Sequence, residues 1–238
     1  MDVREESTDP GVAPPVAVDP RVVADNVRDV RNRITALGGR DVRIIAVTKG
    51  FGLDAALAAM AAGCHGVGEN YAQEVVAKFG AMESSERPAI HFIGHLQSNK
   101  VEMLAPLITI WQSVDRPSIA TAIGTRRPGA GVLIQVNATG ESNKGGCRPA
   151  DTGDLIDHAT RQGLEVRGLM TIGPTDGDRD RTAEAFATVA DLRVRFGLAE
   201  LSMGMTDDMD LAVPLGATMV RIGRALFGRR PPKKAPDH

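Results

Sequence analysis

Short apolar runs rich in β-branched residues alternate along the chain with longer stretches whose apolar residues recur at helical spacing. A short bounded apolar run is typical of a buried strand, and a spacing of three or four residues is typical of an amphipathic helix. The first stretch, residues 21–37, has this helical spacing and ends at Gly38-Gly39, a natural helix stop. The pattern therefore predicts that a helix opens the folded part of the chain.

The segments after this helix pair into β/α units. The predicted strands cover residues 42–48, 65–68, 89–93, 108–114, 131–137, 165–172, 201–203 and 218–222. The helical stretches that follow them cover residues 53–62, 72–82, 98–105, 118–127, 150–162, 181–196 and 209–215, with a short helix at Ala225 after the last strand. About eight such units close a barrel rather than an open doubly wound sheet. We therefore expect an α/β fold, a single (β/α)8 TIM barrel with an extra N-terminal helix.

Composition sets the expected domain boundaries. The 238 residues are 42% hydrophobic, which is enough to bury one full core, and one such barrel commonly needs about 250 residues. Residues 1–20 are acidic and rich in proline and lack the basic and apolar regions of a signal peptide, so we expect a disordered extension. The barrel then covers residues 21–230, and residues 231–238 form a flexible tail.

Charge and cysteine content exclude several classes of function. The formal net charge of −2 and the pI of about 6.2 provide no basic field for nucleic acid. No apolar stretch approaches the roughly 18 residues that a membrane helix needs, so we expect a cytoplasmic protein without a membrane partner. Cys64 and Cys147 have no partners at metal-ligand spacing, which predicts neither a metal site nor a disulfide framework.

Lys49 is the most informative residue for chemistry, because it stands just past the first buried strand. Desolvation there favours the neutral amine, which can condense with a carbonyl group. The alternative is an ordinary lysine at a strand end whose ammonium reaches water along its aliphatic chain.

Polar residues follow nearly every predicted strand. In a barrel, the loops after the strands meet at one face, where active sites are built. The residues at these positions are Lys49, Glu69, Asn70, Gly94, His95, Ser113, Asn137, Thr171, Ser202, Met203, Gly204, Arg221 and Gly223. We interpret them as parts of a single site.

The last two loops predict where a phosphate group would bind, since barrels often hold phosphate after strands seven and eight. Gly204 and Gly223 permit close backbone approach, Ser202 offers a hydroxyl and Arg221 a two-pronged cation. Ordinary turns at the glycines, and an ion pair of Arg221 with Asp207 or Asp208, are the alternatives. A lysine opposite a phosphate site predicts pyridoxal 5′-phosphate as the ligand.

Several motifs carry a resemblance to a known family. They are Ala46-Val47-Thr48-Lys49, Gly68-Glu69-Asn70-Tyr71-Ala72-Gln73-Glu74, His91-Phe92-Ile93-Gly94-His95-Leu96-Gln97-Ser98-Asn99-Lys100, Gly168-Leu169-Met170-Thr171-Ile172, Leu201-Ser202-Met203-Gly204-Met205-Thr206-Asp207-Asp208-Met209 and Met219-Val220-Arg221-Ile222-Gly223. In these motifs the chain resembles the pyridoxal phosphate homeostasis proteins (YggS/PROSC type), which have the fold of the barrel domain of alanine racemase. The resemblance covers residues 21 to 230.

The resemblance implies a role for each matching site residue. Lys49 would form a Schiff base with pyridoxal 5′-phosphate, and Asn70 would lie beside the cofactor. The phosphate would be held by the loop residues Ser202, Met203 and Gly204 together with Arg221 and Gly223. Two residues depart from the family pattern: Arg224 stands where a small hydroxylic residue is usual, and Thr206 replaces a serine.

The resemblance also implies a function. The protein would carry and buffer the cofactor, maintain vitamin B6 homeostasis, supply apoenzymes that depend on the cofactor, and catalyse no reaction of its own. We expect a monomer. The alternative is a small racemase or decarboxylase of the barrel fold, which would need acid/base groups on both faces of the substrate. Tyr71 is the only tyrosine, and a β-rich second domain with a catalytic tyrosine is not expected in this sequence.

Other polar residues leave alternatives open. The resemblance implies that Lys144 is a candidate second site for transient capture or release of the cofactor, and the alternative is a solvated loop lysine. His95 is a candidate for ligand contact. His91 is expected to be a hydrogen-bonded core residue, and Lys78 to face solvent. Asp207, Asp208 and Asp210 are expected to stabilise a helix N-terminus.

Overall fold

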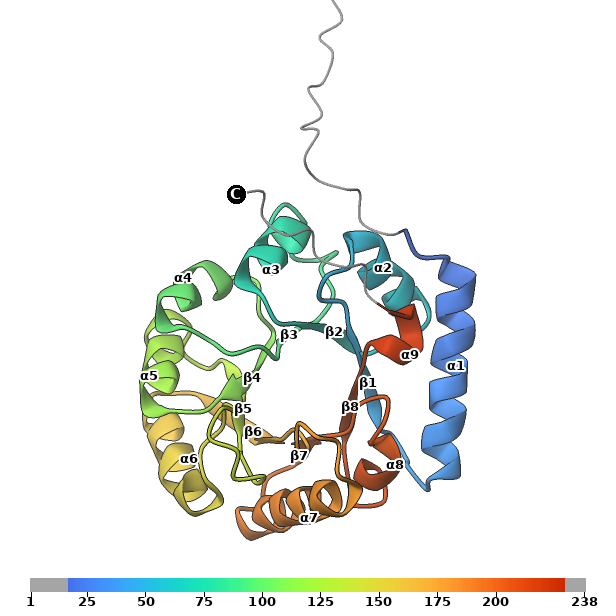
Figure 1. Ribbon diagram of the computed structural model, residues 1–238. Helices are drawn as coiled ribbons and strands as arrows, with labels where there is room; N and C mark the ends of the chain where they lie inside the picture. Colours follow the sequence, from blue (N-terminus) through green and yellow to red (C-terminus); the bar gives the residue numbers. More distant parts are fainter. Residues whose placement is uncertain (1–16, 230–238) are drawn as a thin grey trace, which may run out of the picture.

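The computed structural model describes residues 17–229, which form a closed barrel of eight parallel strands (Figure 1). The strands are β1 (Arg43–Val47), β2 (Gly66–Glu69), β3 (Ile90–Phe92), β4 (Ile110–Val114), β5 (Gly131–Gln135), β6 (Glu165–Met170), β7 (Glu200–Ser202) and β8 (Met219–Ile222). Each strand pairs with the next one along the chain, and β8 closes on β1 with Arg43 opposite Met219 and Ala46 opposite Ile222. The predicted barrel is confirmed.

Helices surround the barrel as an outer ring (Figure 1). They are α1 (Pro20–Ala36), α2 (Leu53–Ala61), α3 (Ala72–Phe79), α4 (Val101–Leu104), α5 (Pro117–Arg126), α6 (Thr152–Arg161), α7 (Arg179–Arg195), α8 (Met209–Ala212) and α9 (Arg224–Phe227). Two 3-10 turns, η1 (Ser98–Lys100) and η2 (Pro149–Asp151), precede α4 and α6. Within the described residues, no helix combines the length and apolar character needed to cross a membrane.

Helix α1 is the predicted additional helix, and it packs against α2 and α9. Its buried residues, Val23, Val27, Val30 and Ile34, form the stripe that the helical spacing predicts. The helix begins one residue earlier than expected, because the Asp19 side chain caps it by accepting from the Arg21 N–H, and proline is favoured in the first turn. The rest of the expected extension, residues 1–16, and the expected tail, residues 231–238, lie outside the described residues.

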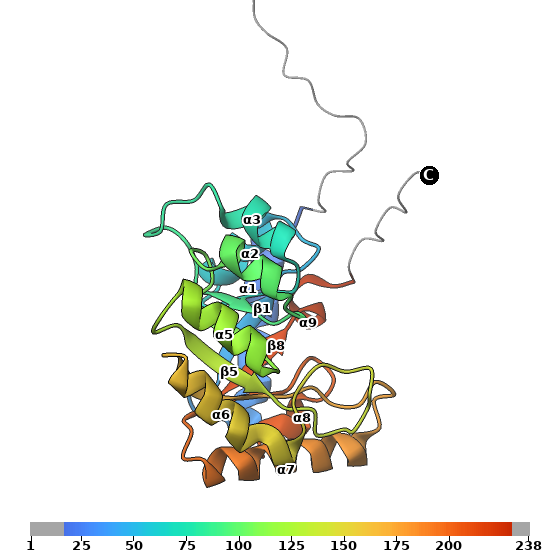
Figure 2. The same ribbon diagram turned by 90° about the vertical axis from the view of Figure 1, so that its left-hand side faces the viewer.

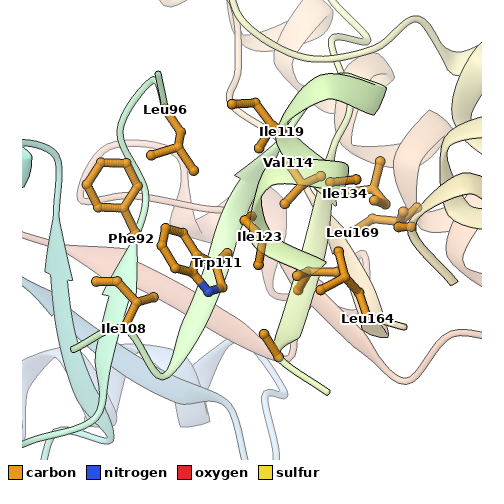
Figure 3. Packing of buried hydrophobic residues seen from close by; sticks show 14 of the residues in the cluster. Phe92, Leu96, Ile108, Trp111, Val114, Ile119, Ile123, Ile134, Leu164 and Leu169 are labelled. Atoms are coloured by element: carbon orange, nitrogen blue, oxygen red, sulfur yellow. The ribbon is translucent and has the colours of Figure 1, made fainter. Parts of the chain in front are cut away.

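The core has two layers. Inside the barrel, Ile45, Leu133 and Met219 belong to a small apolar cluster, and a larger cluster fills the space between strands and helices. Trp111 and Phe92 lie in the larger cluster, with ring centroids 6.2 Å apart (Figure 3).

Candidate functional site

A cavity of about 440 Å³ opens at the carboxyl ends of β1 and β8. Its lining comes from the loops after β1 and β7 and from the segment around α9, and consists of Val47, Lys49, Phe51, Met205, Thr206, Asp207, Arg221, Gly223, Arg224, Gly228 and Arg229. Helix α9 and the loops before α6 and α7 project on the same side of the barrel (Figure 2). A cavity of this size, with a few polar groups in an apolar lining, suits a small molecule.

Lys49 lines the cavity from the turn that follows β1, and its residue is half-buried. Thr48, the residue before it, is fully buried, and Gly50, the residue after it, has a φ of 79°. Glycine adopts this left-handed conformation at little cost, so the chain can turn sharply there. The position at the cavity is the one that the carbonyl hypothesis requires.

A buried ion pair lies behind this turn. Lys78 Nζ is 2.8 Å from Glu69 Oε1 and 3.4 Å from Glu74 Oε2. The Lys78 side chain is only 9% exposed, so the expectation that it faces solvent is wrong. The four-residue spacing from Glu74 to Lys78 is the signal in the sequence, because side chains at that spacing meet on one helix face.

Arg221 is buried, and its guanidinium points to polar groups inside the barrel. Nη1 donates to Ser202 Oγ at 2.7 Å, and Nη2 donates to the Thr171 carbonyl at 2.8 Å. Burial lowers the pKa of Arg221 to about 10, which still leaves it a cation at neutral pH. The alternative ion pair with Asp207 is not formed, because Asp207 pairs with Arg224.

Ser202 continues a chain of hydrogen bonds through the barrel interior. Its hydroxyl donates to Gln112 Oε1 at 2.6 Å, and Gln112 Nε2 lies 2.7 Å from His91 Nδ1. Since the amide nitrogen can only donate, His91 Nδ1 is the acceptor and the ring is neutral. Burial lowers the pKa of His91 to about 4, in agreement with this state. The prediction of a hydrogen-bonded core histidine is confirmed.

The neutral state of His91 predicts a pH dependence of folding stability. Between pH 6.5, the ordinary pKa of histidine, and about pH 4, the unfolded state binds more protons at this residue than the folded state. Its contribution to the free energy of unfolding should therefore fall as the pH is lowered through this window, by about 3 kcal/mol in total. Urea unfolding of the parent and of His91→Asn at pH 7 and pH 4.5 measures the difference. His95→Asn, at a 66% exposed side chain, is the control; equal pH dependence in parent and His91→Asn would contradict the prediction.

The two predicted phosphate loops meet beside the cavity. Gly204 has a φ of 93°, its carbonyl accepts from the Arg221 N–H at 2.9 Å, and a Cβ there would lie 2.6 Å from Ala212 Cβ. The Thr206 hydroxyl accepts from the Ala225 N–H at 3.3 Å, which connects the loop after β7 to the start of α9. Arg224, the departure from the family pattern, also lines the cavity.

The predicted cofactor residues thus occupy different depths. Lys49, Arg221 and Gly223 line the cavity, whereas Ser202 lies behind Arg221 in the interior chain. The Met203 side chain is fully buried in the larger apolar cluster. The sequence did not predict the other lining residues as binding residues, because no distinctive spacing marks them: Val47, Phe51, Met205, Thr206, Asp207, Arg224, Gly228 and Arg229.

Asn70 follows β2, and its Oδ1 atom is buried without a hydrogen-bond partner among the described residues. A buried amide oxygen without a partner is costly unless a ligand or water supplies a donor. Gly94 approaches it closely: a Cβ on Gly94 would lie 2.1 Å from the Asn70 carbonyl oxygen and 2.6 Å from its Cα.

Gly94→Ala should therefore displace the Asn70 backbone and lower the free energy of unfolding by about 1–3 kcal/mol, the usual cost of overpacking. It should also weaken ligand binding, because Asn70 moves. Denaturant unfolding and equilibrium titration measure the two effects. Gly153→Ala is the matched control, since its Cβ would meet only Phe196 ring atoms at 3.2 Å. Parent-like behaviour of Gly94→Ala would show that this loop shifts freely.

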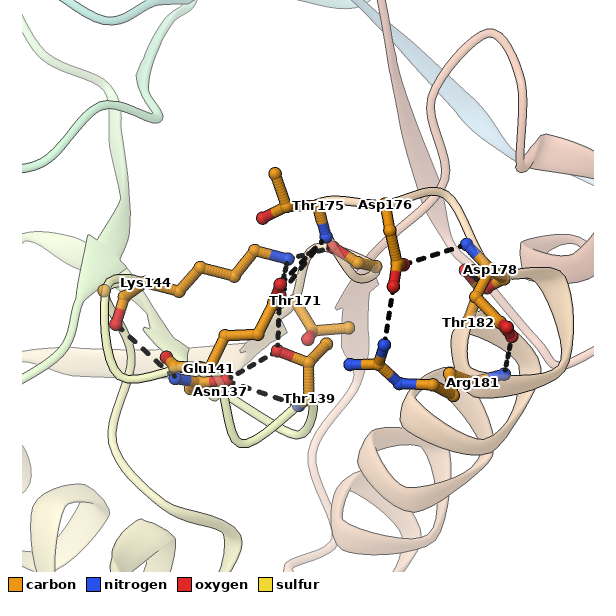
Figure 4. A network of polar contacts seen from close by, with 12 residues as sticks. Asn137, Thr139, Glu141, Lys144, Thr171, Thr175, Asp176, Asp178, Arg181 and Thr182 are labelled. Carbon is orange, nitrogen blue, oxygen red and sulfur yellow. Dashed lines mark hydrogen bonds and ion pairs between the residues drawn. The ribbon is translucent and has the colours of Figure 1, made fainter.

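The candidate second lysine, Lys144, lies in a polar network after β5 (Figure 4). Lys144 Nζ is 2.5 Å from Glu141 Oε2 and donates to the Gly173 carbonyl. Its side chain is 19% exposed and paired, so it is not the freely solvated lysine of the alternative. The Lys144 hydrogen bond holds the pKa of Glu141 at about 2. A role in cofactor capture stays a prediction.

His95 lies at the mouth of the barrel but outside the cavity lining. Its Nδ1 atom is 3.7 Å from Asp115 Oδ2. The acidic cluster before α8 is explained by local contacts: Asp208 Oδ1 accepts from the Met205 N–H, and Asp210 pairs with Arg179. Asp208 is the N-cap residue of α8 without a side-chain capping bond to that helix, so the expected stabilisation is of the preceding turn. Cys64 and Cys147 are both free thiols, as expected.

Comparison with known proteins shows the family and the fold of this chain. Residues 18–231 match the family model of the alanine racemase N-terminal domain. Among curated proteins, the pyridoxal phosphate homeostasis protein of Pseudomonas aeruginosa is 40% identical over 223 residues, covering 87% of this chain and 96% of that protein. The protein of the same name from Escherichia coli is 35% identical over 226 residues, covering 87% and 97%.

Solved structures show the same barrel. PipY of Synechococcus elongatus, solved with pyridoxal phosphate bound, is 30% identical with a TM-score of 0.75, covering 87% of this chain and all of PipY. Alanine racemase of Clostridium difficile in complex with cycloserine shares the fold, with 16% identity, a TM-score of 0.70, and coverage of 89% of this chain and 62% of the racemase. The sequence, the barrel and these relatives together place this chain in the family of pyridoxal phosphate homeostasis proteins.

Proposed function

We propose that this protein binds pyridoxal 5′-phosphate covalently through Lys49 and carries and buffers it, so maintaining vitamin B6 homeostasis. One observation carries the proposal: Lys49 and the cations Arg221 and Arg224 line the same cavity at the carboxyl face of the barrel. The name of the relatives and the ligand bound in PipY support it.

The residues present fit this ligand. When bound, it supplies an aldehyde that condenses with a primary amine, forming a C=N bond with loss of water. Lys49 provides the amine at one side of the cavity, and Arg221 and Arg224 provide positive charge for an anionic group. Asn70 follows β2 outside the cavity lining, and its unpartnered Oδ1 is an acceptor whose desolvation cost a ligand donor would remove.

Arg224 provides a cation in place of the hydroxyl that is usual at this position. In the structure its guanidinium is paired with Asp207, and both side chains are largely exposed. An ion pair of this kind contributes little by itself, so a phosphate group can attract Arg224 at small cost. The phosphate is thus held by the backbone of the loop of Ser202, Met203 and Gly204, by Gly223, and by the two arginines, because the Ser202 hydroxyl is engaged in the interior chain and the Met203 side chain is buried in the apolar cluster.

The protein acts as a carrier and not as a racemase or decarboxylase. Two-base racemisation needs a proton-transfer group on each face of the substrate carbon. Among the described residues that line the cavity, Lys49 is one such group, and the carboxylate there, Asp207, lies in the loop after β7 that would hold the phosphate and not on the opposite face of the substrate. Tyr71 stands at the N-cap of α3, outside this lining.

The partners of this protein are pyridoxal 5′-phosphate and the apoenzymes that receive it, with neither nucleic acid nor a membrane as a partner. It acts as a cytoplasmic monomer. Light scattering should return a mass near the 25.2 kDa of one chain, and a dimer mass would refute this part of the proposal.

The deciding experiment is an absorbance spectrum of the purified protein with added pyridoxal 5′-phosphate, before and after borohydride reduction, followed by mass mapping. A yellow band and a reduced adduct on Lys49 support the proposal. Transfer of the ligand to an apoenzyme, with no racemisation of alanine, separates carrier from enzyme. No adduct on Lys49 would refute the proposed site.

A further inference from the structure

Two side chains of helix α3 form hydrogen bonds with the backbone on both sides of Lys49. On one side, the Thr48 carbonyl accepts from Lys78 Nζ at 2.8 Å. On the other side, the Gly50 N–H donates to Glu74 Oε2 at 2.7 Å. The two peptide groups that flank Lys49 are therefore held by two side chains one helical turn apart.

Lys78 is fully committed to these contacts. Its ammonium group has three N–H donors, and three acceptors surround it: the Thr48 carbonyl, Glu69 Oε1 at 2.8 Å and Glu74 Oε2 at 3.4 Å. Lys78 is thus a structural residue whose donors are engaged by fixed acceptors, one of them the carbonyl of the residue before Lys49.

Glu69 is the third side chain that contacts this turn, together with Glu74 and Lys78. It is fully buried, and its Oε1 atom accepts from both Thr48 Oγ1, at 2.7 Å, and Lys78. Its other oxygen, Oε2, has no partner among the described residues. Burial raises the pKa of Glu69, and Lys78 and Thr48 oppose that rise. Burying this carboxylate costs desolvation energy. Its two hydrogen bonds come from Thr48, the residue before Lys49, and from Lys78, which also binds the Thr48 carbonyl.

The geometry points to Glu69, Glu74 and Lys78 as positioning residues for Lys49, and this inference rests on the proposed function. Gly50, with its φ of 79°, leaves the turn easy to rotate. Hydrogen bonds to the carbonyl of Thr48 and the N–H of Gly50 remove that freedom and aim the Lys49 side chain into the cavity. Displacing a reacting group by about 1 Å can cost about 100-fold in rate, so such a clamp affects reaction more than ligand binding.

The test separates reaction from binding with two ligands. The rate of appearance of the yellow band with pyridoxal 5′-phosphate reports attack by Lys49. Equilibrium binding of pyridoxine 5′-phosphate, which has an alcohol in place of the aldehyde, reports the noncovalent site. Glu74→Ala removes the acceptor for the Gly50 N–H, whereas Glu74→Gln keeps an acceptor oxygen without the charge.

We expect Glu74→Ala to slow the appearance of the band by about 10- to 100-fold and to change pyridoxine 5′-phosphate affinity less than about twofold. Glu74→Gln should recover most of the parent rate. Glu83→Ala, at an exposed residue just past α3, is the control and should match the parent. The double variant Glu69→Gln with Lys78→Met removes both buried charges together and should also slow the band selectively.

Each contrary outcome has one meaning. Parent rates in Glu74→Ala and in the double variant would overturn the positioning role while leaving Lys49 as the site. Equal losses of rate and of pyridoxine 5′-phosphate affinity would also overturn it, since the network would then hold the cavity in general. Absence of a Lys49 adduct in the unaltered protein would instead refute the proposed function. If the double variant fails to fold, the two Glu74 variants still decide.

Discussion

Lys49→Ala is expected to abolish the yellow absorbance with pyridoxal 5′-phosphate and to leave no adduct after borohydride reduction. Lys49 is the lysine among the described residues that lines the cavity, and alanine has no amine to form the C=N bond. Weak binding should remain, because Arg221 and Arg224 stay in place and still attract the phosphate group. The measurement is a titration followed by absorbance and by mass mapping of the reduced protein.

The matched control is Lys100→Ala, which removes a lysine from η1, outside the cavity lining. It should keep both the band and the adduct. If Lys49→Ala retained an adduct at the parent rate, another lysine would be the site of attachment. Lys144 would then be the first to examine, because it follows β5 as Lys49 follows β1, at the carboxyl ends of parallel strands.

Arg221→Gln is expected to weaken retention of the cofactor by about 1.5–3 kcal/mol, the scale of one hydrogen bond to a charged group, which corresponds to roughly 10- to 150-fold. Glutamine is shorter and neutral. It therefore cannot present a positive charge to the cavity and also donate to both Ser202 and the Thr171 carbonyl. The barrel should stay folded, because the substitution also removes a cation from a buried position.

Equilibrium titration and denaturant unfolding test the two parts of this prediction. Arg126→Gln is the control, since Arg126 is 51% exposed on α5 and pairs with Glu102. Unchanged affinity in Arg221→Gln would show that Arg221 only supports the barrel interior through Ser202. Complete unfolding would show that the interior chain matters more for stability than for the ligand.

The lysines show which features a local sequence pattern can predict and which it cannot. Lys49 could be recognised because an apolar strand ends directly before it, and that signal is local. Lys78 looked like a surface lysine because it stands near the end of an amphipathic helix, yet it is buried against Glu69. Which helix face meets which strand end depends on how α3 packs on the barrel, and this packing is not encoded in local spacing.

The same limit explains the depths of the predicted phosphate residues. Their place after β7 and β8 followed from counting strands, and the structure brings Gly223 and Arg221 to the cavity. Ser202 turned inward to Gln112 and Arg221, because successive residues of a strand alternate between the two faces of the sheet. Register decides that alternation, and the sequence predicted the strand but not its register.

The sequence by itself determined the barrel, the order of its strands and the strand ends at which Lys49, Asn70 and Arg221 stand, since periodicity and the alternation of β and α segments are local properties of the chain. Only the tertiary structure decided which side chains reach the cavity and which side chains form the interior chain from Arg221 to His91. It also decided that side chains of α3 bind the turn around Lys49. These depend on contacts between residues far apart along the chain, and the closing of the sheet into a barrel is what brings those residues together.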